Sequence, residues 1–183
     1  MTAPVLRALE YHWLNYRRVW RGTMLFSFAN PTLYLAAMGL GLGSLVDSGD
    51  GQSSLGGVSY AAFLAPGLLA ASAMQLAANE SMWPVMGGMK WQRTYVAQTA
   101  TPLEPADAAR GHLLFIALRA LLTASVFAIV MVAFGTAESP GLVLAVPAAA
   151  LCAMAHATPI TAFSAAQEKE TSAFASLNRF VIV

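Results

Sequence analysis

The sequence predicts an all-α fold, a polytopic bundle of membrane-spanning helices with its N-terminus in the cytosol. Of its 183 residues, 57% are hydrophobic and 10% are charged, whereas about 25% of the residues of a soluble domain are charged. Its mean hydropathy is +0.59. Four apolar runs of about 20 residues are long enough to cross a bilayer. We expect one transmembrane domain over residues 1–183, with four complete spans, the start of a fifth, and an interfacial amphipathic helix before the first.

Residues 4–22 predict that interfacial helix. Large apolar side chains recur at spacings of three and four and share one helical face: Leu6, Leu9, Trp13, Tyr16 and Trp20. Arginines occupy the other side. Aromatic rings favour the headgroup level and arginines favour anionic lipid, so we expect Trp13, Tyr16 and Trp20 to anchor the helix along the inner leaflet. The alternative is a helix that packs on a neighbouring helix.

The first predicted span covers residues 24–45 and contains Asn30 and Pro31. Pro31 removes a helical hydrogen-bond donor and should kink the helix. Asn30 needs a partner inside a bundle, and we expect interhelical packing there, with a place on a substrate path as the alternative.

The second predicted span covers residues 58–80, and Gln75, Asn79 and Glu80 lie towards its inner end. An ionisable side chain within a membrane is costly unless it faces the bundle interior or water, which makes it a candidate functional residue. Glu80 lies close to the interface, so simple solvation is an equal alternative.

The third and fourth predicted spans cover residues 112–134 and 141–165. Arg119 is expected to extend its guanidinium back to the inner interface, and His156 is expected to bond to a neighbouring helix, with contact to a substrate as the alternative. The possible substrate path therefore consists of Asn30, Gln75, Asn79, Glu80 and His156. Residues 173–183 start a fifth apolar helix that is shorter than the roughly 20 residues of a span. We therefore expect either that the chain is a fragment or that its final helix ends in an unusual way.

The positions of the basic residues predict the orientation. All 10 lysines and arginines precede the first span, lie in or just after the loop between the second and third spans, or follow the fourth span. The two loops on the other side contain none. Because basic residues are enriched in cytoplasmic loops, the N-terminus and the central loop should face the cytosol.

Residues 83–111 form that central loop, the longest polar interruption in the chain. Gly87 and Gly88 are expected to break the second helix, and residues 89–98 are expected to form a short amphipathic helix. A short helix held between two spans is suited to pass motion from a soluble partner into the bundle. The alternative is a structured connector without a partner.

Two start points are possible for the next helix. Thr101 and Glu104 have the spacing of a capping box, with Pro102 at the first helical position. Glu104 can equally act as the cap, with Pro105 in that position.

The chain resembles the membrane subunit of type 2 ABC exporters, closest to the branch of drug-resistance and nodulation-factor (lipo-oligosaccharide) exporters. An FLAPGLL segment at the second span is matched by Phe63, Leu64, Ala65, Pro66, Gly67 and Leu68, and the loop pattern by Trp91, Arg93, Thr94, Tyr95, Ala97, Thr101, Pro102, Leu103, Asp107 and Gly111. The Asn30-Pro31 pair and the closing Asn178-Arg179-Phe180 are also similar. The family has six spans, so this sequence departs from it after the start of the fifth.

The resemblance implies a multi-pass permease of a bacterial cell membrane that moves an amphiphilic drug, lipid or oligosaccharide outward. It implies two protein partners: separate ABC ATPase subunits, and a second permease subunit that is either identical to this chain or different from it. Membrane lipid would surround the assembly, and no nucleic acid is expected to bind. The loop would couple to the ATPase through Met89, Trp91, Arg93, Thr94, Tyr95, Thr101, Pro102, Leu103 and Asp107.

The sequence contains no G-x-x-x-x-G-K-[ST] phosphate loop, so ATP and Mg²⁺ are expected on the partner subunit. We expect no catalytic, cofactor or metal site in this chain. A non-transporting membrane scaffold remains an alternative, and a small intramembrane enzyme a weaker one, because no HExxH or paired-carboxylate arrangement is found.

Overall fold

The structure, a computed structural model, describes residues 2–48, 55–137 and 139–167. These residues are helical apart from their connections, which confirms the all-α prediction for this part of the chain. The helices are α1 (Thr2–Ala36), the π-helical η1 (Ala37–Gly43), α2 (Ser44–Asp47), α4 (Tyr60–Lys90), α5 (Thr94–Thr99), α6 (Pro105–Ala133) and α7 (Leu142–Ala166). The predicted start of a fifth span, residues 173–183, and the similar Asn178-Arg179-Phe180 lie outside the described residues.

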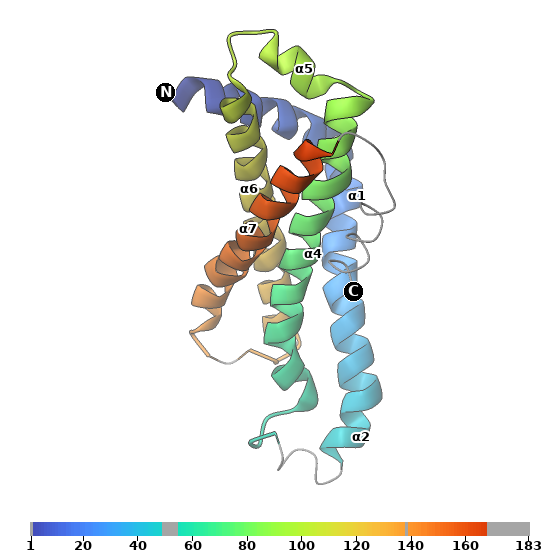
Figure 1. The fold of residues 1–183 in the computed structure, drawn as a ribbon. Helices are drawn as coiled ribbons and strands as arrows, with labels where there is room; N and C mark the ends of the chain where they lie inside the picture. Colours follow the sequence, from blue (N-terminus) through green and yellow to red (C-terminus); the bar gives the residue numbers. More distant parts are fainter. Residues whose placement is uncertain (1, 49–54, 138, 168–183) are drawn as a thin grey trace.

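Among the described residues, four helical stretches are long and apolar enough to cross a membrane: Pro4–Asp47, Tyr60–Lys90, Pro105–Ala133 and Leu142–Ala166. They run the length of an elongated bundle, and α5 lies across one end of it (Figure 1). We call this end the α5 end, and the opposite one the α2 end.

The core lies between α4, α6 and α7, and small side chains dominate it. Fully or nearly buried alanines line all three helices: Ala65, Ala73, Ala77, Ala120, Ala124, Ala149, Ala150, Ala153 and Ala157. Small residues let helix backbones approach closely, which is the usual basis of helix packing in membranes, where lipid removes much of the hydrophobic drive. Leu35 of α1 joins this core.

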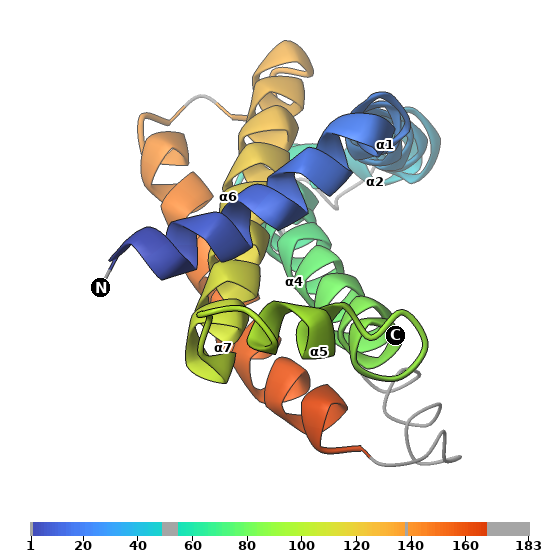
Figure 2. The same cartoon turned by 90° about the horizontal axis from the view of Figure 1, so that it is seen from above.

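The predicted interfacial helix over 4–22 and the predicted span over 24–45 are joined in the structure, because α1 continues through their boundary. The N-terminal part lies across the end of the bundle and the later part runs along its length (Figure 1), and the interfacial position stays a prediction. Gly22 and Thr23 do not end the helix, and the Thr23 hydroxyl donates back to the Val19 carbonyl at 3.2 Å. The N-terminal part of α1 crosses the α5 end of the bundle over α6, and the later part runs beside α4 (Figure 2).

The far end of this helical stretch passes through the π-helical turn Ala37–Gly43 to Asp47. The Asp47 carboxylate then accepts a hydrogen bond at 3.0 Å from the backbone N–H of Tyr60, and the Ser59 hydroxyl accepts one at 3.3 Å from Ala62 N–H. Both bonds satisfy donors that the first turn of α4 leaves free. The Asp47–Tyr60 bond thus joins the end of α2 to the start of α4.

Helix α4 is longer than predicted. It continues through Gly87 and Gly88 to Lys90, so the expectation that these glycines break the second helix is wrong. Both glycines are buried, and a Cβ atom at Gly88 would lie 2.5 Å from the Tyr95 ring. They serve close packing against the following segment, and tertiary contact here outweighs the low helix propensity of glycine.

The expected helix over residues 89–98 is also wrong in its start. Met89 belongs to α4, and α5 begins at Thr94 after a turn in which Arg93 adopts a left-handed φ of 52°. Helix α6 begins at Pro105 with Glu104 as N-cap, which is the second of our two start points. Thr101 does not cap it, because the Thr101 hydroxyl donates to the Gln98 carbonyl at 2.6 Å.

The crossing of α1 over α6 depends on Gly111. A Cβ atom at Gly111 would lie 2.5 Å from Ala8 Cβ and 3.0 Å from the Leu9 backbone nitrogen. We therefore expect Gly111→Ala to destabilise the folded protein by about 1–3 kcal/mol through overpacking, measured by thermal unfolding in detergent.

Gly67→Ala is the matched control. Gly67 lies inside α4, and a Cβ atom added there would meet no described atom of another helix within 4 Å, so alanine should be neutral or stabilising by up to about 1 kcal/mol. Equal melting temperatures for the two variants would contradict the role assigned to the crossing.

Candidate functional site

Helix α5 and the turn before it carry the exposed part of the predicted coupling loop. The Trp91 side chain is 57% exposed, and its ring stacks on Trp83 at 6.4 Å between centroids and 17° between planes. Arg93 and Val96 are also exposed. The left-handed turn at Arg93 directs the chain from α4 into α5. These side chains form an apolar and cationic surface at the α5 end.

Tyr95 fixes α5 to the long helices. Its ring lies against Gly88 of α4 and meets the His112 ring of α6 edge-on at 6.2 Å. Burial, with smaller contributions from Tyr11 and Glu80, raises the pKa of the Tyr95 phenol well above its usual range, so the group stays neutral. Because the ring fills the space left by a glycine, α5 cannot shift without moving α4 or α6.

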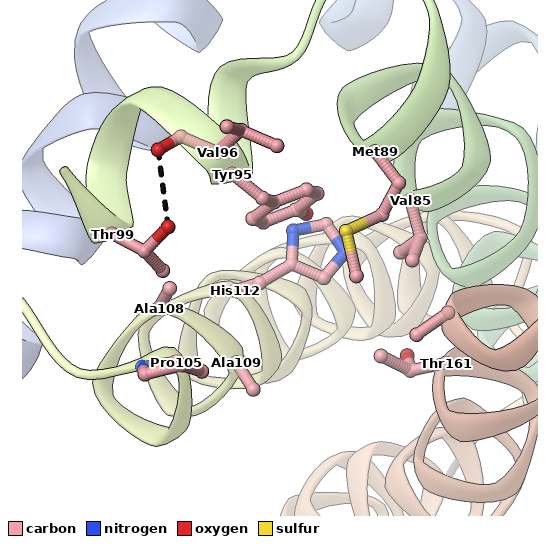
Figure 3. Close-up of a pocket in the computed structure, with 11 residues that line it drawn as sticks. Val85, Met89, Tyr95, Val96, Thr99, Pro105, Ala108, Ala109, His112 and Thr161 are labelled. Atoms are coloured by element: carbon pink, nitrogen blue, oxygen red, sulfur yellow. Dashed lines mark hydrogen bonds between the residues drawn. The ribbon is translucent and has the colours of Figure 1, made fainter.

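An apolar cavity of about 250 Å³ lies beneath α5, between α4, α6 and α7. Figure 3 shows Tyr95, His112 and Met89 side by side at one wall and Thr161 of α7 at another. The Thr99 hydroxyl donates to the Val96 carbonyl at 3.0 Å and stays within α5. This cavity leaves the inner face of α5 incompletely packed.

The later residues of the predicted coupling loop lie between α5 and α6. Pro102 is exposed and Leu103 is half-buried. Thr94 donates a long hydrogen bond of 3.4 Å to the Gly88 carbonyl. Asp107 is 4.0 Å from Arg110 one turn along α6, a weak surface pair.

A second cavity, of about 400 Å³, is bounded by α1, α4, α5 and α6. We call it the aromatic chamber, since its walls include Tyr11, His12, Tyr16, Trp83, Trp91, Tyr95, His112 and Phe115, together with Glu80 and Arg119. The His12 and His112 rings are 4.7 Å apart. Among the described residues, His12 Nε2 and His112 Nδ1 are buried without a hydrogen-bond partner.

An ion pair between Arg119 of α6 and Glu80 of α4 lies in the wall of this chamber. Arg119 is 8% exposed, and its guanidinium carbon lies 5.0 Å from the Tyr16 ring centroid and 5.9 Å from that of Phe115. Such stacking is favourable for a desolvated guanidinium. The pair therefore joins α1, α4 and α6 at one point.

This arrangement gives Arg119 and Glu80 a partner that neither expectation named, because each is the other's partner in an ion pair. The expected extension of Arg119 to the inner interface and the two alternatives for Glu80 stay predictions. The signal in the sequence was two opposite charges inside consecutive apolar runs. Sequence reasoning noted each residue singly and missed the pairing.

A third cavity, of about 320 Å³, continues along α1, α4 and α6 on the other side of Arg119. We call it the amide groove, after Asn30, Gln75 and Asn79, and it is also lined by Thr23, Ser27, Ser72 and Thr123. Three of the five residues of the predicted substrate path therefore share one groove, and Glu80 lies at its end in the neighbouring chamber.

His156 is separate from this groove. Its Nδ1 bonds to the Cys152 carbonyl at 2.9 Å, one turn earlier in α7. The expected bond to a neighbouring helix is therefore wrong, because the residue four positions back in the same helix already supplies an acceptor.

The three predicted anchor residues do not share one environment. Trp13 and Trp20 are exposed, whereas Tyr16 is 8% exposed and packs on Arg119 and Phe115. The predicted apolar face therefore does not point in one direction as a whole: Tyr16, like Ala8, packs on α6, whereas the two tryptophans are exposed. Within residues 2–48, 55–137 and 139–167, no group of three His, Cys, Asp or Glu side chains could hold a metal ion.

Long apolar helices, joined at one end by a short exposed helix and enclosing a polar groove, define a multi-pass membrane protein. The chain is homologous to nodulation protein J, which confirms its resemblance to the nodulation-factor branch of type 2 ABC exporter membrane subunits and indicates a bacterial membrane protein.

It is 34% identical to nodulation protein J of Rhizobium leguminosarum bv. trifolii over 169 residues, covering 86% of this chain and 62% of that protein. For Rhizobium meliloti (strain 1021) the identity is 33% over 147 residues, covering 80% and 54%. The chain thus spans about 62% of the length of the first of these relatives. No protein-family model matches it, and no solved structure does.

A double-mutant cycle tests the ion pair. Glu80→Gln and Arg119→Gln should each destabilise the protein by about 3 kcal/mol, since each leaves a charge buried without its partner. The double variant, whose two amides can hydrogen-bond, should lose clearly less than the sum, with a coupling free energy above about 1 kcal/mol. The measurement is unfolding by denaturant in detergent, and strictly additive losses would show that the two residues do not interact.

Proposed function

We propose that this chain is the membrane-spanning permease subunit of an ABC-type exporter that moves an amphiphilic drug, lipid or oligosaccharide outward. The observation that carries the proposal is the short helix α5 with the turn before it, which expose Trp91, Arg93 and Val96 between the ends of α4 and α6. Homology to nodulation protein J supports it.

The rigid attachment of α5 supports a coupling role. A partner that presses on Trp91 and Arg93 moves Tyr95, and the contacts of Tyr95 with Gly88 and His112 transmit the movement to both long helices. The apolar cavity beneath α5 gives room for such a displacement. Coupling of this kind requires an element with two arrangements, one of which the partner favours.

ATP is hydrolysed, in this proposal, by separate ATPase subunits that carry the nucleotide and Mg²⁺. A second permease subunit, alike or different, completes the path. The amide groove favours a cargo with a polar head and an apolar body, because hydroxyl and amide side chains line it between otherwise apolar helices. Polar groups at this depth are found where they face a bundle interior or a cargo rather than lipid.

The α5 end faces the cytosol in this proposal, and the N-terminal part of α1 lies along the inner leaflet. Support comes from the basic residues, which gather at this end in Arg7, Arg18, Lys90 and Arg93. Exposed Trp13 and Trp20 lie on the same part of α1, where indole rings would reach the headgroups.

Co-purification with the ATPase subunit tests the coupling surface. We expect wild-type protein to retain the ATPase and the Trp91→Ala, Arg93→Ala variant to lower retention by about tenfold or more, since Trp and Arg anchors each contribute on the order of 2 kcal/mol to interfaces. The matched control is Trp20→Ala, Arg21→Ala, which removes an exposed tryptophan and an exposed arginine, 5.8 Å from cation to ring, away from α5. Equal loss in both variants, or in neither, contradicts the proposal.

Cysteine labelling tests the orientation. In a Cys152→Ala background, Ser48→Cys at the α2 end should react with a membrane-impermeant maleimide in intact cells, and Gln92→Cys at the α5 end should react only after the membrane is opened, because both positions are exposed on the protein. The readout is a gel shift with a polyethylene-glycol maleimide. The reverse pattern would invert the orientation and exclude an ATPase at α5.

A further inference from the structure

The aromatic chamber and the amide groove meet at a single charged side chain. Arg119 lines both, whereas Glu80 lines only the aromatic chamber. The two spaces, of about 400 and 320 Å³, therefore lie on either side of the Glu80–Arg119 pair. Within the described part of the chain, Arg119 is the one residue that the linings of the two spaces share.

The walls of the amide groove make Arg119 its dominant electrostatic feature. Among the described residues that line it, every other polar side chain is a neutral hydroxyl or amide. Arginine stays protonated in proteins and presents its donors in a planar fork suited to carboxylate and phosphate oxygens. With Arg119 8% exposed, the charge is felt with little screening by water.

We propose that Arg119 is the anion-binding residue of the passage, and that the cargo carries an anionic oxygen group, such as a phosphate, sulfate or carboxylate, that takes the place of Glu80. This inference rests on the proposed export function and names the chemical class of its cargo.

The exchange of one anion for another keeps the guanidinium paired throughout. A neutral head group that displaced Glu80 would leave Arg119 without a counter-charge in a buried site, which is strongly unfavourable. Glu80 can be released more easily than Arg119, because its side chain is 22% exposed and faces the larger chamber. The displaced carboxylate therefore moves into the chamber, while the cargo anion takes its place on the Arg119 guanidinium.

Fluorescence quenching tests this assignment without any ATPase. Trp83 and Trp91 line the aromatic chamber, so a bromoalkyl phosphate bound at Arg119 should quench tryptophan emission. A bromoalkyl glucoside of the same chain length serves as the neutral probe. The protein is the full chain, in nanodiscs of phosphatidylcholine, and each probe is titrated to give a Kd.

Three variants separate the contributions of Glu80 and Arg119. Glu80→Gln removes the competing carboxylate and should tighten phosphate binding about tenfold, the effect of one charge-assisted hydrogen-bond pair. Arg119→Gln should weaken it by about tenfold or more. The double variant, which replaces the ion pair with two amides and keeps the site neutral, should bind as weakly as Arg119→Gln. None should change glucoside binding.

Arg110→Gln is the matched control, because Arg110 lies on the same helix with an exposed side chain and outside both cavities. Phosphate binding within about twofold of wild type in the folded double variant would overturn the proposal, as would unchanged binding in Glu80→Gln. Because no ATPase is present, such a failure is separate from a failure of ATPase co-purification.

A membrane lipid is the other source of an anionic group. Repeating the titration in nanodiscs that contain phosphatidylglycerol separates the two. Undiminished phosphate binding supports a cargo anion, whereas competition by phosphatidylglycerol that disappears in Arg119→Gln would assign the site to a resident lipid and overturn the cargo assignment.

Discussion

Polar groups inside a bilayer have no water to bond to, and the buried Arg119 of α6 finds its partner in Glu80 of α4. Because one residue comes from α4 and the other from α6, their pairing sets the relative depth of those helices. The Tyr16 ring over Arg119 adds α1 to the same point. The two polar cavities and the close crossing at Gly111 all lie around this junction.

Around this junction, the helices associate through the close fit of small and large side chains, because the hydrophobic effect contributes little to helix association within lipid. Alanines bring α4, α6 and α7 together along their length, while Gly88 and Gly111 admit Tyr95 and Ala8 at the α5 end. Lipid tails are as apolar as leucine, so it is the fit of small residues that selects one arrangement over others. A polar groove can persist within such a bundle since the helices around it are held by backbone proximity.

The sequence was sufficient for the features that follow from composition and period. The apolar run read as residues 141–165 corresponds to α7 at Leu142–Ala166, and the all-helical class follows from the same pattern. It was insufficient wherever a distant residue decides local structure. Gly87 and Gly88 have low helix propensity, and the buried Tyr95 contact that keeps them helical is not visible in their neighbours. Likewise, Glu80 and Arg119 are 39 positions apart, and only the register of α4 against α6 brings them together.

The continuity of α1 through η1 and α2 has a geometric consequence. A helical stretch of 44 residues, Pro4–Asp47, is about 66 Å long at 1.5 Å per residue, roughly twice the 30 Å hydrocarbon thickness of a bilayer. The stretch is not a straight rod, because its N-terminal part lies across the α5 end and its later part runs along the bundle (Figure 1). One continuous helical backbone therefore connects the part that crosses α6 to the Asp47–Tyr60 bond at the opposite end, so that the two ends of the bundle share a single element.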